Sequence, residues 1–121
     1  MLIHEFFTQL LPADELSILQ PLLEMARPRY FQKGELLLAE GETPTEIVFI
    51  QKGVFRGFFY NAGGKDVTDC FCYRFGEPAV PSLPLDAPAH VSMEALTKSN
   101  VISFPAAPLA EFVVKSTFAL R

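Results

Sequence analysis

The sequence predicts a mainly β fold of the α+β class: a jelly-roll barrel, or double-stranded β-helix, flanked by N- and C-terminal helices. Three observations predict it. All seven glycines lie between Gly34 and Gly76, where they separate short strand-like segments. Turn signals in this part recur roughly every 7–13 residues, which is typical of antiparallel sandwiches and barrels. So many strands must close on themselves, and a jelly roll does so without long exposed edges.

Length, composition and charge restrict the class of protein. The chain has 121 residues, 50% of them hydrophobic, and a formal net charge of −4. One ordinary domain with a packed core fits these values, whereas a nucleic-acid-binding surface would normally be basic. The N-terminus lacks the basic and apolar regions of a signal peptide, and no apolar run approaches the ~20 residues of a membrane helix. We therefore predict a cytoplasmic protein without membrane contact.

Residues 2–27 are predicted to be helical. Leucines recur there at spacings of three and four, as they do on the buried side of a helix. Asp14 and Glu15 follow Pro12, so acidic groups lie in a first helical turn, where the helix dipole favours them. Pro21 is expected to kink or restart the helix. The leucines of the buried side are Leu16, Leu19 and Leu23.

Short strands with a hairpin loop at Asn61–Lys65 are predicted next. The order of elements is strands over 29–76, a proline-rich loop over 77–89, strands over 90–96 and 101–104, and a short helix after Pro108. Residues 116–121 look like the first turn of another helix. We accordingly expect one domain, 1–121, with N-terminal helices at 1–28, the β-roll at 29–105 and C-terminal helices at 106–121.

Alternation along the strands predicts which side chains share a face. From 66 to 75, one face is expected to carry Val67, Asp69, Phe71, Tyr73 and Phe75, and the other Asp66, Thr68, Cys70, Cys72 and Arg74. From 90 to 96, one face carries Val91, Met93 and Ala95, and the other His90, Ser92 and Glu94. The segment Phe55–Tyr60 is apolar on both sides, so one side is expected to line the roll and the other to pack under a helix.

Five short runs, in this order and spacing, resemble cyclic-nucleotide-binding-type domains, in particular the effector domains of the Crp/Fnr family of bacterial transcription regulators. The runs are Tyr30–Glu42, Ile47–Arg56, Gly64–Val67, Phe75–Glu77 and Glu94–Thr97. The resemblance covers about residues 12–121. It implies a sensor domain that acts on DNA only through a C-terminal domain absent from this chain, and it makes a homodimer a candidate assembly.

The resemblance also implies a phosphate-binding cassette that starts with Phe-Gly-Glu, continues as a short helix and ends with an arginine before a strand. Helix N-terminal amides and the guanidinium would hold the anion, and the Glu would accept a hydrogen bond from a ribose hydroxyl. Phe75–Glu77 match the start. Pro78, however, has no N–H to donate, and the expected arginine falls on Ala89.

A cyclic phosphate in this cassette would have no fixed cation, because no Lys or Arg occurs between Arg74 and Lys98. It would face Glu77 and Asp86, and burying an unpaired charge is costly. Ordinary cAMP binding is therefore not expected, and no cofactor is predicted, although a cyclic nucleotide remains an open alternative. The candidate ligand-binding residues are Gly76, Glu77, Ala89, His90, Ser92 and Arg74.

Three of these candidates also have a simpler structural interpretation. Glu77 is more simply a turn or capping carboxylate, and His90 and Arg74 are more simply solvated polar residues. Either of the last two could supply a positive charge to an anion, His90 when protonated and Arg74 by moving inward.

Other chemistry is poorly supported. Cys70 and Cys72 point the same way on one strand, but two thiols do not complete a tetrahedral metal site, and they are too few for an iron–sulfur centre. A metal-dependent cupin site would need several histidines, and the chain has only His4 and His90. No nucleophile–base pair is evident, so neither a metal site, a catalytic residue nor an enzyme is predicted.

The sequence therefore predicts the ligand-sensing domain of a Crp/Fnr-like regulator with a degenerate cassette, responding to a small-molecule effector. The alternative is a ligand-free interaction or dimerisation module built on the same roll. An apolar cavity for some other small molecule remains compatible with both.

Overall fold

The computed structural model describes residues 20–79 and 87–107, together with Glu5, Thr8, Gln9, Pro12 and Asp14. Seven strands lie in these described ranges. They are β1 (Arg27–Phe31), β2 (Leu36–Leu38), β3 (Glu46–Lys52), β4 (Phe55–Tyr60), β5 (Asp66–Cys72), β6 (Ser92–Ala95) and β7 (Ser99–Pro105). The expected helices beyond Pro108 and most of those before residue 20 lie outside the described residues. The division into three segments stays a prediction.

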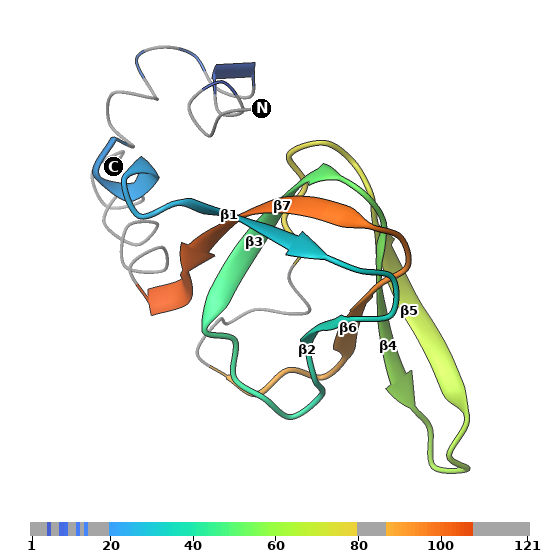
Figure 1. Cartoon of the computed structure of the whole chain (residues 1–121). Coiled ribbons are helices and arrows are strands. Elements are labelled where there is room, and N and C mark those ends of the chain that lie inside the picture. The colour runs from blue at the N-terminus through green and yellow to red at the C-terminus, as the bar shows by residue number, and fades with distance from the viewer. Residues whose placement is uncertain are drawn as a thin grey trace.

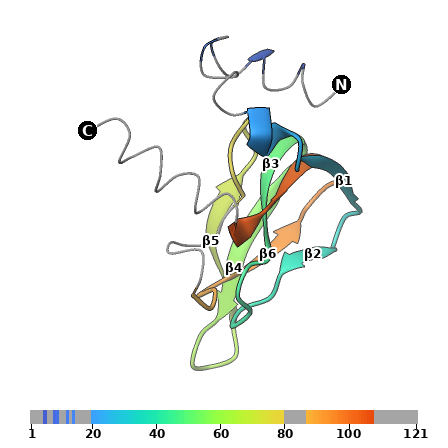
Figure 2. The same ribbon diagram turned by 90° about the vertical axis from the view of Figure 1, so that its left-hand side faces the viewer.

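The strands form two antiparallel sheets, with the orders β1-β7-β3 and β2-β6-β4-β5. Except for the β4–β5 hairpin, neighbours in each sheet come from distant parts of the chain, which is the strand exchange of a jelly roll. Figures 1 and 2 show the two sheets facing each other, with the β4–β5 hairpin extending away from the other strands. The predicted fold class, a mainly β jelly roll, is confirmed. No helix in the described ranges is long and apolar enough to cross a membrane.

The core lies between the two sheets and takes side chains from both. Its members include Phe31, Val48, Ile50 and Val101 from the three-stranded sheet, and Phe55, Cys72, Val91, Met93 and Ala95 from the strands of the other sheet or the residues next to them. The rings of Phe31 and Phe55 meet edge to face across it, with centroids 5.5 Å apart. The predicted shared face of Val91, Met93 and Ala95 is therefore correct, and it points into the core.

The three-stranded sheet is buried on both faces where β3 pairs with β7. Val48 pairs with Ser103 and faces the core, whereas Ile47 pairs with Phe104 and points the other way, yet all four are almost inaccessible to solvent. In the segment Phe55–Tyr60 the expected apolar groups on both faces are present. Among the described residues, the guanidinium of Arg56, 4.2 Å from the ring centroid, and the ring of Tyr60 pack against Phe58. The expected helix over this face stays a prediction, because most of the predicted helical residues lie outside the described ranges.

A bulge in β5 changes the predicted faces of that strand. Gly57 pairs with Cys70 but the next residue, Phe58, pairs with Thr68, so Asp69 is an extra residue in the ladder. An extra residue reverses the alternation on one side of it. Val67 therefore shares the inner face with the two cysteines, and Asp66 and Thr68 share the outer face with Phe71, which is 56% exposed. The prediction that placed Val67 beside Phe71, and Asp66 and Thr68 beside the cysteines, was wrong.

The N-terminal helical segment ends earlier than predicted. Residues 20–23 are helical, the amides of Met25 and Ala26 donate to the carbonyls of Leu22 and Leu23 in a closing turn, and β1 begins at Arg27. Pro28 explains the difference, because a proline disfavours a helical conformation in the residue before it. Pro28 itself lies in an edge strand, where its missing N–H is tolerated.

Two turns have the predicted chemistry. In the loop 61–65 the Asn61 side-chain oxygen accepts hydrogen bonds from the amides of Gly63 and Lys65, both at 3.0 Å, and Gly64 has a positive φ of 78°. Gly53, between β3 and β4, has φ 120°, and a Cβ atom there would overlap the side chain of Ser99. Only glycine fits this second position.

Candidate ligand site

The start of the predicted cassette is fastened to strand β3 by backbone hydrogen bonds. The Gly76 amide donates to the Ile50 carbonyl at 2.7 Å, and the Ile50 amide donates to the Glu77 carbonyl at 3.0 Å. The Ala79 amide donates to the Val48 carbonyl at 2.9 Å. Gly76 has a positive φ of 81°, which lets the chain turn sharply before this contact. The segment 76–79 thus behaves as a short extension of the three-stranded sheet.

The Glu77 carboxylate closes this turn. One of its oxygens, Oε1, accepts hydrogen bonds from the backbone amides of Tyr73 at 2.8 Å and Arg74 at 3.1 Å, and the Glu77 amide donates to the Arg74 carbonyl at 3.0 Å. This is the capping role that the sequence favoured for Glu77. In this conformation that oxygen is directed at the turn's own backbone.

Ala89 occupies the position where the resemblance places an arginine, and it is buried. Its amide donates to the Glu42 carbonyl at 2.9 Å, and its carbonyl accepts from the Gly41 amide at 2.8 Å. These two bonds join Ala89 to the turn after β2, and the side chain is only 4% exposed. The residues between Arg74 and Lys98 contain no Lys or Arg, so no part of this segment can provide a guanidinium or an ammonium group.

Of the remaining candidates, Arg74 joins the Glu77 turn through its backbone, whereas Ser92 begins β6 and His90 lies two residues before it. The hydroxyl of Ser92 accepts a hydrogen bond from the Glu40 amide at 2.9 Å, and His90 is exposed. Arg74 is exposed, with its guanidinium carbon 5.8 Å from the Tyr73 ring centroid. The structure does not gather the predicted site residues around one described cavity. Their roles as ligand contacts stay predictions.

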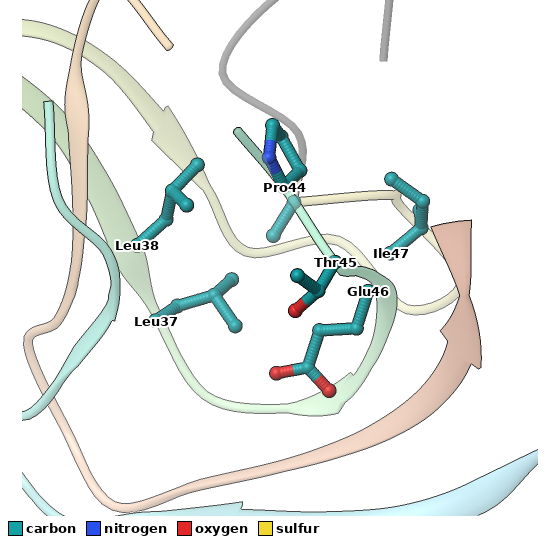
Figure 3. A pocket seen from close by; sticks show the side chains of 7 residues that line it. Leu37, Leu38, Pro44, Thr45, Glu46 and Ile47 are labelled. Atoms are coloured by element: carbon teal, nitrogen blue, oxygen red, sulfur yellow. The ribbon is translucent and has the colours of Figure 1, made fainter. Parts of the chain in front are cut away.

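A small pocket that the sequence did not predict lies beside the cassette (Figure 3). It has a volume of about 30 Å³, which is room for about one water molecule. Its charged lining residue, Glu46, is engaged by an ion pair with Arg29 and by the hydroxyl of Ser103, which donates to it at 2.5 Å. The lining residues are Leu37, Leu38, Pro44, Thr45, Glu46, Ile47 and Ala79. The apolar run of β2 was the only sequence signal for this pocket.

Arg56 is the centre of a charged network that the sequence also did not reveal. On the outer face of the four-stranded sheet, its Nε donates to Glu94 at 2.9 Å, and its two terminal nitrogens donate to Asp66 at 2.8 and 2.7 Å. One of these nitrogens also donates to the Thr68 hydroxyl at 2.9 Å. The Asp66 and Glu94 carboxylates raise the pKa of Arg56, and the Arg56 guanidinium lowers the pKa of Asp66.

The described ranges contain no group of three or more His, Cys, Asp and Glu side chains placed to hold a metal ion. The two cysteines are unbridged thiols, Cys72 buried and Cys70 half-buried.

Residues 28–116 match the family described as "Cyclic nucleotide-binding domain". This match spans most of the chain, and the chain belongs to that family. The resemblance found in the sequence is thereby confirmed. Among curated proteins, no match to the chain was found.

Solved structures with this fold include several bacterial regulators. A candidate cAMP-binding regulatory protein from Silicibacter pomeroyi DSS-3 is 24% identical, with a TM-score of 0.72 over 87% of this chain and 47% of that one. The catabolite activator protein of Thermus thermophilus is 17% identical, with a TM-score of 0.69 over 93% of this chain and 51% of that one. The sensor domain of the transcriptional regulator DNR from Pseudomonas aeruginosa is 14% identical, with a TM-score of 0.72 over 84% of this chain and 68% of that one. The chain thus spans about half the length of the first two.

Proposed function

We propose that this chain is the effector-sensing domain of a Crp/Fnr-like bacterial transcription regulator, and that its cassette does not bind cAMP in the usual way. Family membership and the similarity to the fold of regulator domains support the first part. The second part rests on one observation: the position expected to carry the phosphate-binding arginine is the buried Ala89.

The residues present do not fit a cyclic phosphate. An enclosed anion needs a paired cation or several directed N–H groups, because an unpaired buried charge costs several kcal/mol. The cassette segment contributes no cation, Pro78 contributes no N–H, and an oxygen of Glu77 already accepts two backbone hydrogen bonds. The pocket beside Ala79 is lined largely by apolar side chains and has room for about one water molecule.

In this proposal the domain acts by a population shift rather than by catalysis. A small, uncharged or weakly polar effector would bind one arrangement of the cassette more tightly than another. The segment 76–79 is suited to transmit a change in the cassette's arrangement, because its hydrogen bonds to β3 join the cassette directly to the three-stranded sheet. DNA contact would belong to a C-terminal domain outside this chain, and a homodimer is a candidate assembly.

A thermal titration tests the cassette. The melting temperature of the chain is followed with cAMP and with cGMP up to millimolar concentration, for wild type, Glu77→Ala and Glu77→Gln. A bound ligand at 100 times its Kd would stabilise the fold by about 2.7 kcal/mol and raise the melting temperature. Because neither nucleotide is expected to bind, the proposal predicts no saturable shift in melting temperature. A saturable shift that is lost in Glu77→Ala would overturn it. Glu77→Gln keeps an acceptor for the turn amides, so it separates ligand loss from turn damage.

The coding sequence beyond Arg121 tests the regulator assignment. A helix-turn-helix segment is the expected result.

The second candidate function is a ligand-free interaction or dimerisation module. It is favoured by the exposed aromatic side chains beside the cassette: Phe71 and Tyr73, each 56% exposed, and Phe75, 41% exposed. Sedimentation of wild type and of Phe71→Ser tests whether these side chains form an interface. A dimer that dissociates only in the variant, together with no effector response in the thermal titration, would support the module over the sensor.

A further inference from the structure

Two arginines lie on the same side of β1, the edge strand of the three-stranded sheet (Figure 1). Arg27 pairs with Ser103 and Arg29 pairs with Val101, and directly opposed residues in an antiparallel pair share a face of the sheet. Val101 belongs to the core, so both arginines lie on the core-facing side. Arg27 is nevertheless exposed, and the side chain of Arg29 is 40% exposed. The two guanidinium groups therefore lie at the edge of the core, in reach of solvent.

Both arginines line an open groove with a volume of about 570 Å³. This volume is in the range of small-molecule binding sites. The other lining residues are Thr45, Glu46 and Pro105. None of them belongs to the cassette segment 76–79, and the inference drawn from this groove does not depend on the proposed regulatory function.

Arg29 is held in place by the protein. It forms an ion pair with Oε1 of Glu46, and its guanidinium carbon lies 4.7 Å from the ring centroid of Phe31. The hydroxyl of Ser103 donates to Oε2 of Glu46 at 2.5 Å, so both carboxylate oxygens are engaged. A guanidinium that is already held loses little conformational freedom when a ligand binds.

Arg27 supplies a positive charge that the protein does not balance. Among the described residues its side chain has no hydrogen-bond or ion-pair partner. Two guanidinium groups and one carboxylate line the groove, which leaves one positive charge uncompensated, although the whole chain has a formal net charge of −4. One negative charge placed between the two arginines would neutralise the groove.

We propose that this groove binds a small monocarboxylic acid, whose carboxylate is held by Arg27 and Arg29. The planar fork of a guanidinium matches a carboxylate in geometry, and Pro105 offers an apolar wall to the rest of the acid. A phosphate monoester carries nearly two negative charges at neutral pH. It would leave a negative charge uncompensated beside Glu46, and like charges repel. The charges of the groove therefore favour a carboxylate over a phosphate.

Titration of the full chain with benzoate, followed by the NMR shifts of the backbone amides, tests the site. The expected result is saturable 1:1 binding, with the largest shifts at Arg27, Thr45 and Glu46. Benzamide has the same shape without the charge and is expected not to bind saturably. Phenyl phosphate is expected to bind more weakly than benzoate.

Arg27→Gln is the decisive variant, because Arg27 has no partner in the described structure whose loss would destabilise the fold. It is expected to weaken benzoate binding by about fivefold or more, and Arg27→Lys, which keeps the charge, by less. Lys65→Gln is the matched control: it removes the same charge from the tip of the β4–β5 hairpin, outside the groove, and its benzoate affinity should equal that of wild type. The melting temperature of each ligand-free variant shows that it is folded.

Three results would overturn the proposal. One is the absence of saturable benzoate binding to wild type, and another is equal affinity in wild type and Arg27→Gln. Phenyl phosphate binding as tightly as benzoate would overturn the assignment to a monocarboxylate.

Discussion

The Arg56 guanidinium on β4 donates to both carboxylate oxygens of Asp66 on β5, at 2.8 and 2.7 Å. The paired geometry suits a planar guanidinium and cannot be reproduced by an ammonium group. Because Nε of the same side chain bonds to Glu94 on β6, Arg56 joins three neighbouring strands on their outer face. The sheet that carries the cysteines and Met93 is thereby held from the opposite side.

Arg56→Lys is expected to lower the free energy of unfolding by about 1–3 kcal/mol, because lysine keeps the charge but loses most of these hydrogen bonds. Urea denaturation measures this. Arg74→Lys is the matched control, since Arg74 is exposed and takes no part in the network. It should change stability by less than about 0.5 kcal/mol. Equal effects of the two substitutions would contradict a structural role for Arg56.

The Arg56–Asp66 pair also predicts a pH dependence in the acid range. The hydrogen bond from Arg56 lowers the pKa of Asp66 from its ordinary value of 3.8. A carboxylate with a lowered folded-state pKa stabilises the fold above its unfolded pKa, and this stabilisation is lost as the pH falls through the folded pKa. Wild type should therefore be more stable than Asp66→Asn at pH 6, and their melting temperatures should converge below pH 3.8. A difference that persists at acid pH would argue against the carboxylate as its source.

Because of Cys72, we expect the stability of the fold to decrease as the pH rises in the alkaline range. Burial, first of all, raises its pKa from 9.0 to about 12. The neutral thiol therefore stabilises the fold fully below pH 9, and this contribution is lost as the pH rises towards 12. Unfolding of wild type and of Cys72→Ala, followed from pH 8 to pH 11, should show a steeper alkaline decline in wild type. Parallel curves would mean that Cys72 ionises as an exposed thiol does.

Two glycines with positive φ predict unequal costs for the same substitution. Gly41→Ala meets no atom within 4 Å, so only backbone strain of about 1–2 kcal/mol is expected. Gly53→Ala adds a collision with Ser99, and the total cost should reach about 2–4 kcal/mol. Ser99→Gly in the Gly53→Ala background should recover part of the loss in a double-mutant cycle. Strictly additive effects would show that the close approach is unimportant.

The sequence predicted the roll because its signals are local. Gly53 and the loop after Asn61 require particular backbone conformations, and the alternation through Met93 requires one buried face. The end of the N-terminal helix was misplaced, although Pro28 carried the information. The faces of β5 were misplaced because nothing in the residues around Asp69 distinguishes a bulge from regular strand.

The site was predictable to a smaller extent. The cassette start at Gly76 and the capping tendency of Glu77 could be recognised from neighbouring residues. The network of Arg56, Asp66 and Glu94 could not, because its members meet only through the pairing of strands far apart in sequence. The same holds for Gly57, which lies between Cys70 and Met93 only through the pairing of β4 with β5 and β6.

Calorimetric titration of cAMP into the purified chain tests the central claim most directly. The claim is that a cyclic nucleotide-binding fold with alanine at position 89 does not hold a cyclic phosphate. The account predicts only heats of dilution up to millimolar cAMP. A saturable 1:1 binding isotherm with wild type would contradict it.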